Sequence, residues 1–293
     1  MAPHHNRYPY SPITARPAFD WPGGKRLAVY VGLNLEWFSF GHGLGAELAP
    51  GGPPPDVLNY SWRDYGNRVG VFRLAELFAQ LRLPVTLLVN AEMYRHAPQA
   101  VAAFPGAEIA GHGRTNSERQ GELSEADERT LIAETTSAIE QHAGTRPHGW
   151  LGPWISQSHA TPDLLQEAGY TYLLDWCHDD QPVWMKTRKG RILSVPYPQE
   201  LNDIPQIVAR KREGDEFARM IVDAFEVMHA ECRHRPLVMG IALHPYIVGW
   251  PHRFKHLAAA LAHIVERADD RVWLTTAGAI AAHAASLLPD VIP

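Results

Sequence analysis

The stretch RLAVYVGLNLEW, residues 26–37, is an apolar run that ends in polar residues at Asn34 and Glu36. Such a short apolar run, rich in valine and leucine, predicts a buried strand. Next comes helical spacing in GVFRLAELFAQLRL (70–83), where apolar residues recur at 71, 74, 77, 78 and 81. PVTLLVN (84–90) then predicts a second strand. This order of strand, helix and strand favours a parallel sheet with helices outside it.

The same alternation continues to the C-terminus. Further strands are predicted at 107–113, 148–154, 170–176, 192–197, 236–245 and 271–276. Helices are predicted at 123–144, 161–169, 216–232 and 253–268. The number of units favours a barrel over an open sheet, and no repeat or linker indicates a second domain. We therefore expect one α/β domain, a (β/α) barrel over residues 26–293, after an N-terminal arm of residues 1–25 that is rich in proline and aromatics.

Composition limits the possible partners. With 293 residues, 45% of them hydrophobic, the chain can bury a large core. The net charge is −5, and the sequence has no long run of one sign. It therefore lacks the basic segment that would indicate binding to nucleic acid or an anionic membrane, and we expect a small or neutral substrate. The first 26 residues lack the apolar core of a signal peptide, and no later run is long enough to span a bilayer. Together with two cysteines outside any CxxC pair, this predicts a cytoplasmic protein with free thiols.

Motifs for dinucleotide binding, P-loops, zincins and α/β-hydrolases are absent from the sequence. Polar or aromatic residues instead follow the predicted strands, where parallel folds carry their chemistry: Asn34, Glu36, His112, Trp154, Asp175 and His244. A carboxylate base at Glu36 and an imidazole acid at His244 would suit hydrolysis by an activated water. Either residue alone is more often a structural hydrogen-bonding group. Their joint placement favours the catalytic interpretation.

Five fragments follow one another along residues 26–285: GLNLEW, YGNRVGVFRL, EIAGHGRTN, VPYPQELND and LHPYIVGWPHRF. In this order they resemble the polysaccharide deacetylase superfamily, the NodB homology domain, and particularly its small-molecule branch of metal-independent allantoinases and bacterial cyclic-imide hydrolases, or imidases. The extended segment 38–71 is more similar to the imidases than to the allantoinases. The resemblance implies a distorted, TIM-like (β/α) barrel with Glu36 as catalytic base and His244 as general acid.

The sequence departs from the metal-dependent members of that family. Those members have a second acidic residue after the base and two histidines four residues apart, and these positions hold Trp37, His112 and Asn116 here. Tryptophan offers zinc no ligand atom and asparagine is a poor substitute for imidazole, so we expect no metal or other cofactor. His112 would then contact substrate or the attacking water. Two alternatives remain: zinc held by His112 with His42, Asp175 or another distant group, and a purely structural histidine.

The expected substrate-binding residues are Asn34, Trp37, His112, Asn116 and Trp154. Trp37 adjoins the base, and Trp154 lies in GPWISQS, which is similar to the family loop that approaches substrate. Their rings could form the walls of a flat pocket for a planar ring, although such aromatics also cover barrel mouths or subunit interfaces. A long loop, residues 51–68, is expected to act as a lid or a subunit contact, and the alternative is that it only packs on the barrel.

The family resemblance and the residues in its motifs together predict a hydrolase of cyclic amides that opens a maleimide-like, succinimide-like or phthalimide-like ring. Glu36 would take a proton from the attacking water, His244 would protonate the leaving nitrogen, and His112 with N–H donors would stabilise the oxyanion. Three alternatives stay open: an allantoinase or other ureide hydrolase, a zinc-dependent amidase or carbohydrate deacetylase, and a non-catalytic binding protein. The lack of a secretion signal argues against a cell-wall polysaccharide as substrate. The resemblance also implies a homotetramer or another homo-oligomer.

Overall fold

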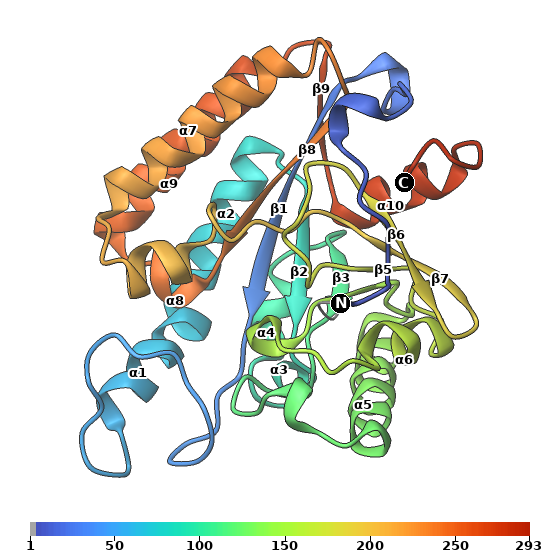
Figure 1. Cartoon of the computed structure of the whole chain (residues 1–293). Coiled ribbons are helices and arrows are strands. Elements are labelled where there is room, and N and C mark those ends of the chain that lie inside the picture. The colour runs from blue at the N-terminus through green and yellow to red at the C-terminus, as the bar shows by residue number, and fades with distance from the viewer. Residues whose placement is uncertain (1–3) are drawn as a thin grey trace.

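One curled sheet of nine strands organises the computed structural model, which describes residues 4–293 (Figure 1). The strand order is β6-β7-β5-β4-β3-β2-β1-β8, and β9 pairs with the first half of β1. All pairs are parallel except β6 with β7. The strands are β1 (Leu27–Leu35), β2 (Val85–Val89), β3 (Glu108–Gly111), β4 (Gly149–Trp150), β5 (Tyr172–Leu173), β6 (Val183–Thr187), β7 (Gly190–Ser194), β8 (Leu237–Leu243) and β9 (Val272–Thr275).

Ten α-helices occur within residues 4–293, and most of them cover the outside of the sheet, where α7 and α9 lie side by side (Figure 1). They are α1 (Val57–Tyr65), α2 (Val71–Leu81), α3 (Glu92–His96), α4 (Pro98–Ala102), α5 (Glu125–Ala143), α6 (Thr161–Glu167), α7 (Gly214–Glu231), α8 (Pro245–Val248), α9 (Pro251–Arg267) and α10 (Ala277–Ser286). The fold is a single α/β domain whose sheet forms a curled half-barrel. The predicted (β/α) barrel is therefore confirmed.

Strand β1 is the centre of the core, and all nine of its residues are buried. Its odd-numbered side chains, such as Val29 and Leu33, pack with α2, α7 and α9. Ala28 and Tyr30 point to the opposite face and pack with residues of β5, β7 and α10. Burial on both faces explains why this stretch is continuously apolar rather than alternating.

Residues 51–68 differ from the expected loop. Within this range the chain forms helix α1, and a π-helical turn (Gly66–Gly70) then joins α1 to α2. The side chain of Asp56 starts the helix, because it accepts a hydrogen bond from the Asn59 backbone N–H at 3.2 Å. The prolines and glycines before Asp56 concealed this cap, so the prediction of a long loop was wrong.

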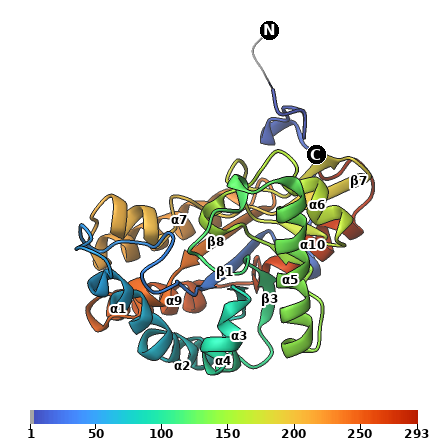
Figure 2. The same cartoon turned by 90° about the horizontal axis from the view of Figure 1, so that it is seen from below.

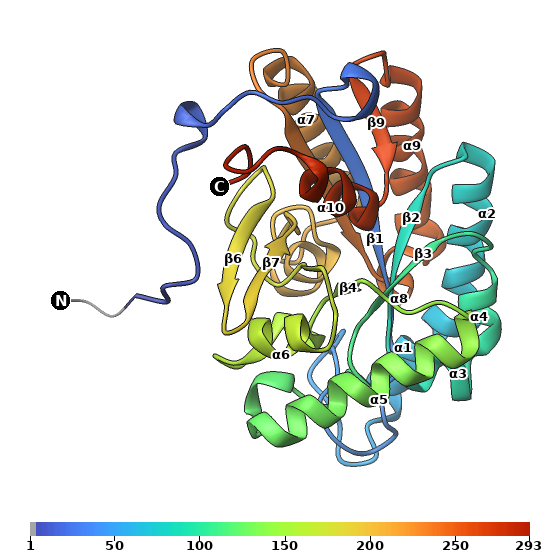
Figure 3. The same ribbon diagram turned by 90° about the vertical axis from the view of Figure 1, so that its right-hand side faces the viewer.

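Edge strand β6 is bonded to both ends of the described chain. The two ends lie on the same side of the molecule (Figure 2), and the N-terminal arm runs beside β6 with the C-terminus near one end of the strand (Figure 3). The N–H of Lys186 donates to the Arg7 carbonyl at 2.7 Å, and the N–H of Trp184 donates to the Pro293 carbonyl at 2.6 Å. Covering these groups protects an edge that could otherwise pair with another chain. No helix among residues 4–293 has the length and hydropathy needed to cross a membrane.

Candidate active site

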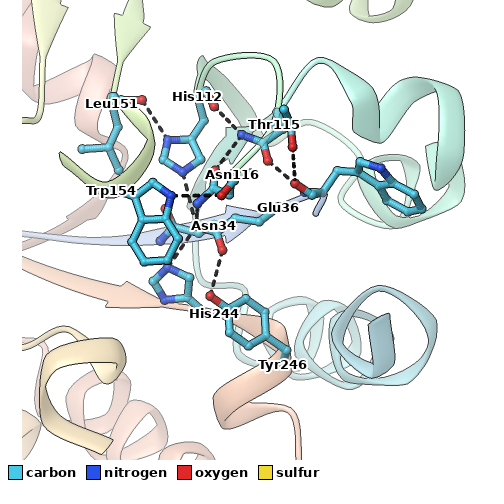
Figure 4. A network of polar contacts seen from close by, with 12 residues as sticks. Asn34, Glu36, His112, Thr115, Asn116, Leu151, Trp154, His244 and Tyr246 are labelled. Carbon is cyan, nitrogen blue, oxygen red and sulfur yellow. Dashed lines mark hydrogen bonds and ion pairs between the residues drawn. The ribbon is translucent and has the colours of Figure 1, made fainter. Parts of the chain in front are cut away.

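The carboxyl ends of β1, β3 and β8 bring Glu36, His112 and His244 to one small cavity (Figure 4). The cavity volume is about 100 Å³. It is lined by Asn34, Glu36, His112, Asn116, Leu151, Trp154, Ile155, Tyr197, Gln199, Asn202, Ile204, Pro205, His244 and Tyr246. Six of the seven residues proposed from the sequence are in this set, and Trp37 is the exception.

The Glu36 carboxylate is buried and held from several directions. Its Oε1 accepts a 2.6 Å hydrogen bond from Asn116 Nδ2, and its Oε2 accepts a 2.8 Å bond from the Tyr246 hydroxyl. Two imidazole nitrogens also face Oε1, His112 Nε2 at 3.3 Å and His244 Nε2 at 3.4 Å. Burial alone would raise the pKa of Glu36, but His244 and the hydrogen bond to His112 lower that pKa below its ordinary value. The side chain is therefore a carboxylate across the neutral pH range.

His244 is held between two carboxylates. Its Nδ1 donates to Asp203 Oδ1 at 2.6 Å, and its backbone N–H donates to Asp203 Oδ2 at 2.8 Å. The other ring nitrogen, Nε2, faces Glu36. Burial alone would lower the pKa of His244, but Asp203 and Glu36 raise it to about 10. At neutral pH the ring is an imidazolium that carries a transferable proton on Nε2.

Backbone and amide contacts orient His112 and Asn116. His112 Nδ1 donates to the Leu151 carbonyl at 2.8 Å, which turns Nε2 toward Glu36. Asn116 Oδ1 accepts a 2.9 Å hydrogen bond from Asn90 Nδ2, so its own Nδ2 points at Glu36. The amide of Asn90 also accepts the backbone N–H of Trp37 at 2.8 Å and donates to the His112 carbonyl. Asn90 therefore connects the strand ends of β1, β2 and β3.

These donors do not fit a zinc ion. Zinc needs about three protein lone pairs, but Asn116 presents an N–H to Glu36, and the Trp37 ring, which has no ligand atom, stacks on His96. The proposed distant partners do not join them: His42 is on an exposed loop, and Asp175 Oδ1 accepts the Gly152 N–H at 2.8 Å outside the cavity lining. Within residues 4–293, no three His, Cys, Asp or Glu side chains are grouped so that they could hold a metal.

Trp37 does not line the cavity, contrary to the prediction. Its ring stacks on His96 with the centroids 4.1 Å apart. Its backbone contributes instead, because its carbonyl accepts the Asn116 N–H at 2.9 Å and the Thr115 hydroxyl at 2.8 Å. Side chains alternate along an extended chain, so the residue after Glu36 points away from the cavity.

Trp154 lies against the cavity as predicted. Its Nε1 donates to the Asn116 carbonyl at 2.9 Å. The backbone of Trp154 and Ile155 is left-handed, with φ of 63° and 53°. This conformation is strained for a β-branched residue such as Ile155, and strain of this kind persists where the surroundings hold it. The turn presents two apolar side chains to the cavity.

Asp203, Tyr246 and Asn90 were not identified as site residues from the sequence. Asp203 ends VPYPQELND, and Tyr246 lies two residues after His244 in LHPYIVG, so both are inside motifs that were already distinctive. Asn90 is the polar end of PVTLLVN, the same kind of signal that identified Glu36. Asn34 was identified, but both hydrogen bonds of its Nδ2 go to the protein, at 3.0 Å to the Tyr197 hydroxyl and at 3.1 Å to the Leu243 carbonyl.

Known proteins share this fold. No family model matches the sequence. A Schizosaccharomyces pombe protein, provisionally named a polysaccharide deacetylase, is 27% identical over 279 residues, which cover 88% of this chain and 85% of the relative. A crystal structure described as a probable polysaccharide deacetylase from Pseudomonas aeruginosa PAO1 has a TM-score of 0.82 and 28% identity, with 94% of this chain and 97% of that chain covered. The PuuE allantoinase structure has the same TM-score of 0.82 and the same 28% identity, with 96% and 99% covered.

Proposed function

Because this chain is a hydrolase of the polysaccharide deacetylase superfamily, we propose that it opens the ring of a small cyclic imide by hydrolysis. One observation carries the proposal. A buried carboxylate, Glu36, and a buried imidazolium, His244, face each other at 3.4 Å on the wall of a very small cavity. That pair supplies the base and the acid that hydrolysis of a C–N bond requires.

The size of the cavity supports a small substrate. Pockets for drug-sized ligands measure about 300–1,000 Å³. The cavity here is about 100 Å³, which suits one small ring and not a polysaccharide chain. Leu151, Trp154 and Ile155 give it apolar walls that suit a planar ring.

In the proposed reaction, Glu36 takes a proton from a water molecule as the water oxygen bonds to an imide carbonyl carbon. The C–N bond then breaks, and His244 Nε2 donates its proton to the departing nitrogen. The nitrogen leaves readily because its developing charge delocalises into the second carbonyl. The product is the ring-opened half-amide of a dicarboxylic acid. Since Glu36 Oε1 and His244 Nε2 are 3.4 Å apart, the proton held by Glu36 can return to His244 and restore the starting state.

The remaining polar residues position this pair. Asn116 and Tyr246 each bond one oxygen of Glu36, which fixes the direction of the carboxylate. Asp203 holds His244 through Nδ1 and leaves Nε2 free to donate. No step needs a metal ion, in keeping with a donor set that does not suit zinc.

From the sequence we also propose a cytoplasmic protein that acts on a small molecule and binds no nucleic acid or membrane. From the family resemblance we propose that it assembles as a homotetramer or another homo-oligomer.

Hydrolysis of a ureide is the second candidate. It is favoured by the similarity to PuuE allantoinase over 96% of this chain. The same acid and base would serve, because a ureide ring also presents a carbonyl carbon bonded to nitrogen.

A substrate panel tests the proposal. We expect purified protein to open succinimide, maleimide or phthalimide, with loss of the ring followed by chromatography and the half-amide identified by mass. Turnover of allantoin alone would favour the second candidate. Release of acetate from an acetylated sugar oligomer, without ring opening of any kind, would contradict the proposed function.

A further inference from the structure

Gln199 carries an amide donor that the protein itself does not use. Its Nε2 is buried and has no hydrogen-bond partner among the residues that the structure describes. Gln199 is one of the residues that line the cavity of Glu36 and His244, and it also borders a neighbouring pocket of about 490 Å³. A buried donor without an acceptor is costly, and such groups in native proteins call for an explanation.

The segment that carries Gln199 is firmly held. The Tyr30 hydroxyl donates to the Pro196 carbonyl at 2.6 Å, and the Tyr197 hydroxyl accepts Asn34 Nδ2 at 3.0 Å. Pro198 packs so closely on Gly240 of β8 that a Cβ there would lie 2.8 Å from its ring. After Gln199, the Ala242 N–H donates to the Leu201 carbonyl at 2.9 Å. The chain on both sides of Gln199 is anchored to the sheet. The segment is therefore not free to shift so that Nε2 reaches an acceptor within the protein.

Three other amides line the cavity, those of Asn34, Asn116 and Asn202. Asn202 accepts the Ile204 N–H through Oδ1 at 3.0 Å, and the other two have their nitrogen atoms paired. Asn34 Nδ2 donates to Tyr197 and Leu243, and Asn116 Nδ2 donates to Glu36. Gln199 differs from these three amides because its Nε2 is buried without a partner among residues 4–293. An imide ring matches this donor, since each of its two carbonyl oxygens is an acceptor and neither can donate.

We infer that Gln199 binds substrate by donating a hydrogen bond from Nε2 to a carbonyl oxygen of the ring. This inference rests on the proposed function and adds a specificity residue to it. A site with a buried donor for a substrate group discriminates strongly against molecules that lack the group, because the donor is then left unpaired. Gln199 would thus disfavour rings that place no carbonyl oxygen opposite its Nε2.

The test replaces Gln199 by groups of similar size that cannot donate. In Gln199→Met and Gln199→Glu we expect kcat/KM for succinimide to fall by about tenfold to a hundredfold, because one hydrogen bond to the ring is lost. The melting temperature should not fall in Gln199→Met, since no bond within the protein is broken. The control is Gln99→Met at an exposed position of helix α4, for which kcat/KM should be unchanged.

The outcomes separate this inference from the proposed function. A wild-type protein that opens no imide and no ureide contradicts both. A wild-type protein that opens succinimide, with Gln199→Met equally active, contradicts only the role of Gln199. A lower melting temperature in Gln199→Met together with unchanged kcat/KM would show a structural role and overturn the inference.

Discussion

Neighbouring groups hold Glu36 and His244 in their charged forms: Asp203 and Glu36 act on His244, and His244 and His112 act on Glu36. Both are almost fully buried, and burial alone would favour the neutral form of each. The ion pair, with Asp203 on the far side of the imidazole, reverses that preference. Before substrate binds, the site therefore already holds a base, Glu36, next to a protonated acid, His244.

Replacing Glu36 by Gln tests the base. The amide keeps the size of the side chain but cannot accept the proton of water, so we expect kcat for imide hydrolysis to fall by about a hundredfold to ten-thousandfold. Steady-state kinetics measure the loss, and circular dichroism checks the fold. Glu122→Gln, at an exposed glutamate, is the matched control and should keep full activity. Ring opening by Glu36→Gln at the wild-type rate would remove Glu36 from the mechanism.

The pH profile tests the acid. The pKa of His244 is raised to about 10, so the proton on Nε2 is present at neutral pH and is lost as the pH rises through that value. We expect kcat to hold through neutral pH and to fall above about pH 9. In Asp203→Asn the imidazolium loses one partner, so the alkaline fall in kcat should move to lower pH. An unmoved profile would mean that Asp203 does not set the protonation of His244.

The free energy of unfolding should also depend on the protonation of His244. The pKa of His244 is higher in the folded protein than its ordinary value of 6.5, so the folded state binds the extra proton between pH 6.5 and about 10. The contribution of His244 to the free energy of unfolding is complete below pH 6.5 and declines toward pH 10. Urea unfolding at several pH values measures this decline, which should be smaller in Asp203→Asn.

At the scale of the elements, close backbone contacts set the position of the site. The π-helical turn after α1 lies directly on α8, which follows His244. Gly66 approaches so closely that a Cβ there would lie 2.6 Å from the Tyr246 nitrogen. Gly70 and Gly249 make a similar contact around Pro245. The glycines of YGNRVG therefore serve packing around the site rather than binding to substrate.

Gly66→Ala tests this contact. The added methyl group must displace α8, which we expect to cost about 1–3 kcal/mol of stability and to lower kcat because Tyr246 holds Glu36. Thermal unfolding and steady-state kinetics measure the two effects. Gly52→Ala is the control, since a Cβ there meets no atom within 4 Å. Equal stability and activity in the two variants would contradict the close packing.

At the scale of the whole molecule, two ion pairs attach the arm before β1 to the α/β domain. Arg7 pairs with Asp163 at 2.7 Å, and Arg16 pairs with Asp179 at 2.5 Å. We expect the double variant Arg7→Ala, Arg16→Ala to lose about 1–3 kcal/mol and to be cleaved faster within the arm by a protease. Ring opening should be unchanged, because neither arginine lines the cavity. A strong loss of activity in a folded variant would show that the arm contributes to the site.

The order of strands and helices could be predicted because buried parallel strands and amphipathic helices leave clear patterns. Glu36, His112 and His244 could be found because each polar side chain ends an apolar run. Helix α1 was missed because a single capping residue, Asp56, starts it after a segment rich in proline. The ring of Trp37 was misplaced because proximity to Glu36 in the sequence does not set the direction of a side chain. Gln199 could not be recognised, since an unpaired donor is visible only when the surrounding acceptors are known.

The central claim is that Glu36 and His244 hydrolyse a cyclic imide without a metal ion. The most direct test is to treat wild-type protein exhaustively with a chelator, measure its residual metal, and follow the opening of succinimide. We predict that metal-free protein keeps the activity of the untreated protein, because the groups that make the proposed reaction possible all belong to the chain. Activity that disappears with the metal and returns with zinc would contradict the account and make His112 a metal ligand.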